Sequence, residues 1–133
     1  MKLKHLFYSV MVVHLFYLVS CTYTTSYEKK PLFSSDLNVV SDQITRIAPV
    51  KNITLHGLEN KRNGKIETSV LSINVLIDEH NNGTEIMGKQ IASIIKNALK
   101  DKEEYTSYKV IFNSPDQENI KSTVYFVYPK GEL

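Results

Sequence analysis

The sequence contains only one cysteine, Cys21, in 133 residues. A single cysteine excludes a disulfide bond within the chain, so the hydrophobic core has to stabilise the fold alone. The composition is compatible with such a core, because 42% of the residues are hydrophobic and 23% are charged. This length and these proportions predict one globular domain.

The chain also lacks a clear excess of charge of one sign. It has 16 basic and 14 acidic residues, but Lys2 and Lys4 lie at the N-terminus, which leaves 14 basic and 14 acidic residues from Cys21 onward. A neutral domain lacks the basic surface that binds nucleic-acid phosphates. We therefore expect no nucleic-acid partner.

Motifs of catalysis and cofactor binding are missing. The sequence has no Gly-x-Ser-x-Gly, no glycine-rich phosphate loop and no His-Glu-x-x-His. Asp78, Glu79 and His80 are consecutive metal-ligand types, but neighbours on a turn rarely converge on one ion, and the stretch lacks the spacing of a calcium loop. His56 is expected to be an exposed residue of a strand. The sequence thus indicates no metal and no cofactor, and favours a non-catalytic role.

A secretory signal is present at the N-terminus. A basic head with Lys2 and Lys4 precedes an apolar run of 15 residues, 6–20, which ends directly before Cys21. A basic head, a short apolar run and a small residue before the cleavage site are typical of a signal peptide. The run is shorter than the roughly 20 apolar residues of a membrane-spanning helix. We predict that residues 1–20 are a signal peptide.

The residues Leu18-Val19-Ser20-Cys21 resemble the lipobox of bacterial lipoproteins. The resemblance implies cleavage before Cys21, a diacylglyceryl group on its sulfur, and usually a third acyl chain such as palmitate on the freed amine. Two or three acyl chains hold a protein stably at a membrane. By analogy, Thr22 in place of an aspartate favours the outer over the inner membrane. An ordinary secretory signal and an uncleaved anchor are the alternatives.

The polar residues 21–34 show no periodicity and include Pro31, which predicts a flexible tether between the lipid anchor and a domain of residues 35–133. At the start of that domain, we expect a short helix capped by Ser35 and ended by Pro49, with an edge strand as the alternative. The expectation depends on four apolar residues at approximately helical spacing: Leu37, Val40, Ile44 and Ile47.

Alternation of apolar and polar residues predicts four strands, at residues 53–58, 65–77, 108–113 and 123–128. A polar turn at residues 59–64 joins the first two strands. It contains Asn63-Gly64, a pair favoured in tight hairpins because both residues tolerate a positive φ. The beginning of the second strand is out of phase with its later alternation, so we expect a β-bulge near Ser69.

A helix is predicted between the second and third strands, after a loop at residues 78–83, and it runs to about Leu99. Asn82 is expected to cap this helix, and Glu85 to complete a capping box. One apolar stripe marks its buried face: Met87, Ile91, Ile94, Ile95, Ala98 and Leu99.

These elements predict an α+β fold with two layers. One long helix covers one face of a four-stranded, mostly antiparallel sheet in the order strand, strand, helix, strand, strand. The connection through the helix makes its two flanking strands parallel. Residues 91–101 and 105–112 also resemble segments of small uncharacterised lipoproteins, which implies no known activity.

The second face of this sheet is the predicted binding face. The helix is expected to cover Leu71, Ile73, Val75, Val110, Phe112, Val124 and Phe126. The opposite face then shows eight residues: Thr54, His56, Ser72, Asn74, Lys109, Asn113, Thr123 and Tyr125. Mixed polar residues with a tyrosine are typical of a protein-contact surface, and also of a solvated antiparallel sheet. Tyr108 and Tyr128 fit either face.

Three functions are compatible with these features. We favour a lipid-anchored envelope protein that is a non-catalytic binding module for another envelope protein or an external ligand. The first alternative is a periplasmic immunity or inhibitor protein that neutralises a toxin. The second is a small envelope hydrolase or metal-dependent enzyme, which requires a concave site that combines His56 or His80 with acidic residues.

Overall fold

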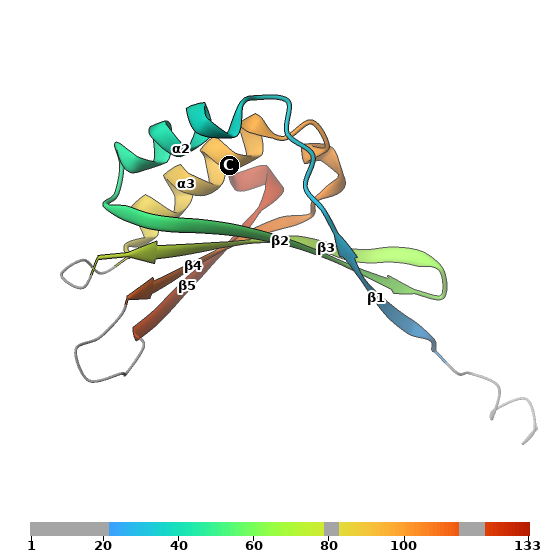
Figure 1. Ribbon diagram of the computed structural model, residues 1–133. Helices are drawn as coiled ribbons and strands as arrows, with labels where there is room; N and C mark the ends of the chain where they lie inside the picture. The colour runs from blue at the N-terminus through green and yellow to red at the C-terminus, as the bar shows by residue number, and fades with distance from the viewer. Residues whose placement is uncertain (1–21, 79–82, 115–121) are drawn as a thin grey trace, which may run out of the picture.

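The computed structural model describes residues 22–78, 83–114 and 122–133. In this part of the chain, five strands form one sheet and two α-helices lie on one of its faces (Figure 1). The elements are β1 (Thr24–Lys29), α2 (Leu37–Thr45), β2 (Val50–Arg62), β3 (Lys65–Ile77), α3 (Glu85–Ala98), η1 (Lys102–Glu104), β4 (Ser107–Ser114), β5 (Ser122–Pro129) and η2 (Lys130–Glu132). The α+β class is confirmed, whereas the sheet has one strand more than the four predicted.

The strands lie in the sheet in the order of the sequence, β1-β2-β3-β4-β5. β3 and β4 are parallel, and the other three neighbouring pairs are antiparallel. Parallel neighbours need a long crossover connection, and α3 lies within the connection between β3 and β4. The predicted parallel pair around the helix is therefore confirmed, in a mixed sheet.

The predicted flexible tether is wrong for residues 24–29, which form a strand. Thr24–Lys29 forms β1, which pairs with residues 57–62 of β2, and Phe33 makes an isolated bridge to Leu99. β1 is an edge strand with two largely solvated faces, so its sequence has no apolar alternation that could reveal it. We call β1 together with residues 57–62 and 65–70 the ribbon, which extends away from the helices (Figure 1).

The turn between β2 and β3 forms the outer end of the ribbon. Asn63 and Gly64 have φ values of 51° and 78°, as a tight hairpin requires, so the predicted hairpin is confirmed. The predicted turn at residues 59–64 was too long, because β2 continues to Arg62. The β-bulge lies at Glu67 rather than at Ser69, since the pairing shifts between Asn60 and Lys61.

Both predicted helices are present, with different caps. Asp36, and not Ser35, caps α2 and accepts a hydrogen bond from the Asn38 backbone N–H at 2.9 Å. Thr84 caps α3 and accepts a bond from the Met87 N–H at 3.3 Å. Thr84 thus has the role predicted for Asn82, which lies outside the described residues.

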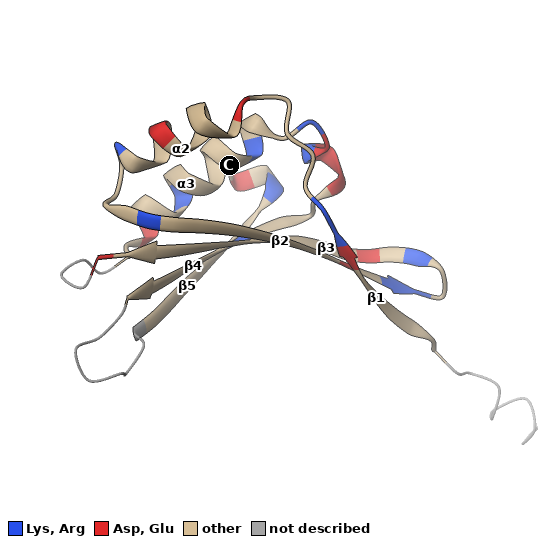
Figure 2. Ribbon diagram, viewed as in Figure 1, with Lys and Arg blue, Asp and Glu red and all other residues tan. Residues whose placement is uncertain are grey.

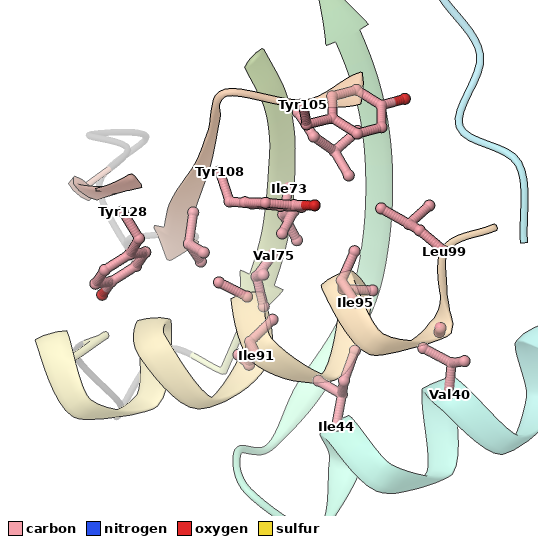
Figure 3. Close-up of a cluster of buried hydrophobic side chains, with 14 of the residues drawn as sticks. Val40, Ile44, Ile73, Val75, Ile91, Ile95, Leu99, Tyr105, Tyr108 and Tyr128 are labelled. Carbon is pink, nitrogen blue, oxygen red and sulfur yellow. The ribbon is translucent and has the colours of Figure 1, made fainter. Parts of the chain in front are cut away.

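The core lies between the two helices and the sheet (Figure 3). Residues Leu71, Ile73, Val75 and Ile77 of β3 are all at most 1% exposed, which confirms their predicted direction. Tyr108 and Tyr128 also lie on the helix-covered face, with each hydroxyl donating to a backbone carbonyl. Val124, predicted to be covered, remains 37% exposed at the margin of this layer.

Candidate functional site

The eight residues of the predicted binding face lie together on the side of the sheet away from the helices. Strand pairing places them side by side, because paired residues point to the same face. Thr54 pairs with Asn74, His56 with Ser72, Ser72 with Lys109, Asn113 with Thr123, and Ile111 with Tyr125. No described element lies against this side (Figure 1). We call it the uncovered face.

Contacts across strands order part of the uncovered face. The Lys109 ammonium group lies 4.6 Å from the centre of the Tyr125 ring, within cation–π distance. The Thr123 hydroxyl donates to the Asn113 side-chain oxygen at 3.1 Å. These contacts link side chains of β4 to side chains of β5 on the uncovered face.

His56 does not belong to a catalytic arrangement in the described structure. Its Nδ1 lies 3.4 Å from Glu28 of β1, and both side chains are more than half exposed. Among the described residues, no three His, Cys, Asp or Glu side chains are close enough to hold a metal ion. His80 and Glu79 lie outside the described residues. Glu28 was missed in the sequence because β1 was interpreted as tether.

The uncovered face is more apolar than predicted. Exposed fractions are 51% for Val127, 36% for Leu58 and 36% for Leu76, and Ile111 is partly exposed between Asn74 and Tyr125. The alternation of β5 already places Val127 on the same side as Tyr125, so the sequence contained this signal. Charges are rare on the central strands (Figure 2), and residues 68–77 and 122–129 have none.

An apolar groove of about 560 Å³ lies on the other side of the sheet, between α2, the first half of β2 and the segment that follows β1. Its walls include Phe33, Leu37 and Leu55. Of its lining residues only Lys51 is ionisable, and Lys51 makes an ion pair with Asp78 at 2.8 Å. The groove can accept an apolar group, and its lining contains the hydroxyls of Ser41 and Thr45 but no histidine, cysteine or acidic residue beside them.

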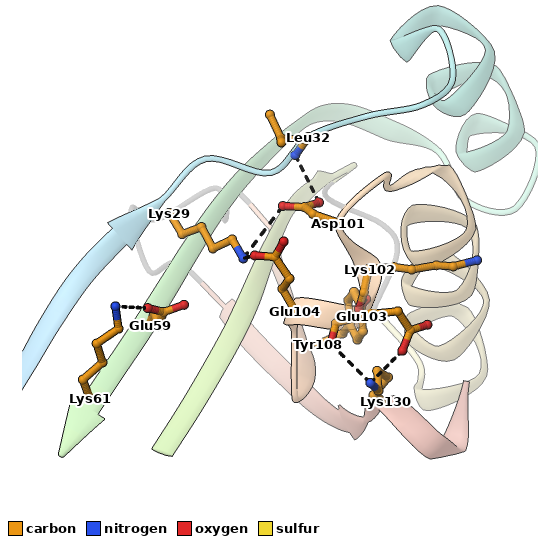
Figure 4. Close-up of polar contacts among 10 residues, drawn as sticks. All are labelled: Lys29, Leu32, Glu59, Lys61, Asp101, Lys102, Glu103, Glu104, Tyr108 and Lys130. Carbon is orange, nitrogen blue, oxygen red and sulfur yellow. Dashed lines mark hydrogen bonds and ion pairs between the residues drawn. The ribbon is translucent and has the colours of Figure 1, made fainter. Parts of the chain in front are cut away.

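A polar cluster attaches the ribbon to the body of the domain (Figure 4). Lys29, at the end of β1, pairs with Glu104 of η1 and lies 4.0 Å from Asp101. The Asp101 side chain is 4% exposed and accepts a hydrogen bond from the Leu32 N–H at 3.2 Å. The Lys29 ammonium group also lies 4.9 Å from the centre of the Tyr105 ring. The cluster therefore has a structural role.

Buried tyrosines next to this cluster have altered acidity. Burial, followed by the Asp101 charge, raises the pKa of Tyr105 above its usual value. Burial and the charges of Asp101 and Glu103 raise the pKa of Tyr108 to about 12. Both hydroxyls are thus held in the neutral form, because an ionised phenol in this environment would lack solvation.

The described part of the chain contains no helix with the length and apolarity to cross a membrane.

Comparisons with known proteins give no assignment. Neither a family model nor a curated protein matches the sequence. Among solved structures, a sex pheromone precursor from Lactobacillus salivarius is 13% identical, with a TM-score of 0.31 over 81% of this chain. The staph-cAM373 sex pheromone precursor is 16% identical, with a TM-score of 0.31 over 80% of this chain. The chain spans 35% and 41% of their lengths. Similarity at this level does not establish a shared fold.

Proposed function

We propose that the protein is a lipid-anchored, non-catalytic binding protein of the bacterial envelope. Acyl chains on Cys21 hold it at the membrane, and the uncovered face contacts a second envelope protein. The anchor depends on the resemblance of Leu18-Val19-Ser20-Cys21 to a lipobox, and the contact depends on the composition of the uncovered face.

The observation that supports the binding role is the uncovered face itself. A sheet face that only meets water usually contains many charged side chains. Here Lys109 is the one charged residue on β4 and β5, while Tyr125 is 60% and Val127 51% exposed. Depletion of charge together with exposed aromatic and aliphatic side chains is the composition of an interface centre.

A photocrosslinking amino acid at position 125 tests the contact in living cells. We expect one identified protein adduct at this position, and none at Ile86, which is 73% exposed on α3 and serves as the control. Val127→Asp should abolish the adduct without reducing protein abundance. Equal adducts at positions 125 and 86 would contradict the proposed contact.

The anchor requires its own measurement. Intact mass spectrometry of protein from the native host should show loss of residues 1–20 and the added mass of acyl chains on Cys21. Cys21→Ser should prevent both changes. A processed chain with a free Cys21 thiol would eliminate the anchor and leave the binding face as a separate question.

A further inference from the structure

We propose that the outer end of the ribbon is a membrane-contact site that binds anionic lipid headgroups. We call this site the ribbon tip and define it as Tyr23, Arg62, Asn63, Gly64, Lys65 and Ile66. The inference rests on the proposed lipid anchor at Cys21 and adds a second contact with the membrane, made by side chains.

The first argument is the length of chain between the lipid and the tip. Tyr23 and Asn63 are joined by two hydrogen bonds, from the Asn63 N–H to the Tyr23 carbonyl at 2.9 Å and from the Tyr23 N–H to the Asn63 side-chain oxygen at 3.2 Å. Only Thr22 separates Tyr23 from Cys21, and the two residue steps between them span at most about 7 Å. An acylated sulfur therefore keeps the ribbon tip within reach of the headgroups.

The second argument is the rigidity of the ribbon. Thr24 pairs with Arg62, and the pairing of β1 with β2 continues without a break to Lys29 and Gly57. Arg62 in turn pairs with Lys65 of β3. The first described residues and the hairpin turn thus lie at one end of the ribbon, remote from the helices (Figure 1). A flexible tether would allow any orientation, whereas this arrangement directs the tip to the membrane.

The third argument is the chemistry of the exposed side chains. Tyr23 is 68% and Ile66 56% exposed, and tyrosine and aliphatic side chains are stable at the boundary between headgroups and water. Arg62 and Lys65 immediately flank the turn, and basic side chains are attracted to anionic headgroups. The tip therefore combines two cations with two side chains suited to the interface.

Acidic residues on the ribbon lie farther from the turn. Glu67 is 3.7 Å from Arg62, and Glu59 is 2.9 Å from Lys61. Each strand residue adds about 3.3 Å, so the backbones of Glu59 and Glu67 lie about 7–10 Å farther from the turn than those of Arg62 and Lys65, while the Glu67 side chain reaches forward to Arg62. The charges nearest to the membrane are positive, which complements phosphatidylglycerol and other anionic lipids.

The presence of a single native cysteine makes it possible to test the membrane contact of the ribbon tip by spin labelling. Since Cys21 is the only native cysteine and is blocked by lipid under the proposed function, an introduced cysteine can be spin-labelled alone. Ile66→Cys reports on the ribbon tip, and Ile86→Cys is the matched control, because both are exposed isoleucines and Ile86 lies on α3, outside the ribbon. The lipidated full-length product is reconstituted in vesicles of phosphatidylglycerol and phosphatidylcholine.

We expect the label at position 66 to be several-fold less accessible to a water-soluble paramagnetic relaxant than the label at position 86. Reversing two charges with Arg62→Glu and Lys65→Glu should restore its accessibility in anionic vesicles. Lys89→Glu makes the same type of change on α3 and should have no effect. In vesicles of phosphatidylcholine alone, the protection should be weaker and insensitive to these charge reversals.

Three results would overturn the inference: equal accessibility at positions 66 and 86, protection that survives both charge reversals, or protection that requires an added protein. Mass spectrometry of the same samples separates this failure from failure of the proposed function. A lipidated Cys21 with an accessible label at position 66 contradicts the ribbon tip alone, whereas a bare thiol contradicts the anchor on which it depends.

Discussion

The same two strands, β2 and β3, pass through two regions with different sources of stability. Beneath the helices, β3 presents Leu71, Ile73 and Val75 to the core, and all three are fully buried. In the ribbon, Arg62 and Lys65 are exposed on both sides of the turn, and pairing is supported by backbone hydrogen bonds and surface ion pairs. Surface pairs contribute little, so the ribbon depends on its continuity with the buried half.

This difference shows how a small domain extends a structured element beyond its core. A strand that is fixed at one end by packing supports pairing farther along the same backbone. The polar cluster of Lys29, Asp101 and Glu104 lies at the junction of the two regions and joins them. Substitutions beneath the helices, at the junction and next to the polar cluster should therefore lower the free energy of unfolding by successively smaller amounts.

The largest effect is expected in the body. Ile73→Ala removes a fully buried side chain and leaves a cavity, which should lower the free energy of unfolding by about 2–5 kcal/mol. Ser72→Ala, one residue away on the uncovered face, should change it by less than about 0.5 kcal/mol. Urea denaturation measures both. Similar losses for the two variants would contradict the assignment of faces.

A smaller effect is expected at the junction. A Cβ atom on Gly57 would lie 2.3 Å from the Lys29 carbonyl oxygen, so Gly57→Ala should displace the end of β1. We expect a loss of about 1–3 kcal/mol, together with faster amide exchange in β1. Gly131→Ala is the control, since no atom lies within 4 Å of its Cβ position. Unchanged exchange in β1 would show that the ribbon does not depend on this contact.

The smallest effect concerns alkaline pH. Because burial raises the pKa of Tyr108 to about 12 in the folded state, the unfolded chain releases this proton first as the pH rises. The stabilisation of the folded state by the neutral Tyr108 hydroxyl is complete below about pH 10. It should decrease by about 1–2 kcal/mol as the pH approaches 12. Urea denaturation across this range tests it. Tyr108→Phe should show a smaller alkaline loss than the unaltered protein, and an equal loss in the two proteins would contradict this prediction.

Much of the fold could be predicted where the sequence pattern reflects one-sided burial. The alternation of residues 71–77 predicts the direction of the second half of β3, and Asn63-Gly64 predicts the hairpin. The same alternation predicts which residues share the uncovered face. The apolar stripe predicts α3, although its cap is Thr84.

β1 and the groove could not be predicted in this way. β1 has no apolar face, and its pairing with residues 57–62 comes from hydrogen bonds that any sequence of suitable length can make. The groove depends on where α2 lies relative to β2, which is a matter of packing between distant elements. No periodicity within the sequence of α2 or of β2 encodes the distance between these two elements.

The sequence by itself determined the α+β class, the hairpin and the direction of the buried apolar side chains of β3, because burial leaves a periodic trace along a single strand or helix. It also contains the lipobox resemblance, which remains a prediction. Only the tertiary structure decided that the segment after Cys21 is a strand, and that Tyr23 lies against Asn63 at the outer end of a ribbon. Pairing between residues 40 positions apart in the chain is a property of the folded backbone, and polar side chains on an edge strand leave no local pattern that reveals it.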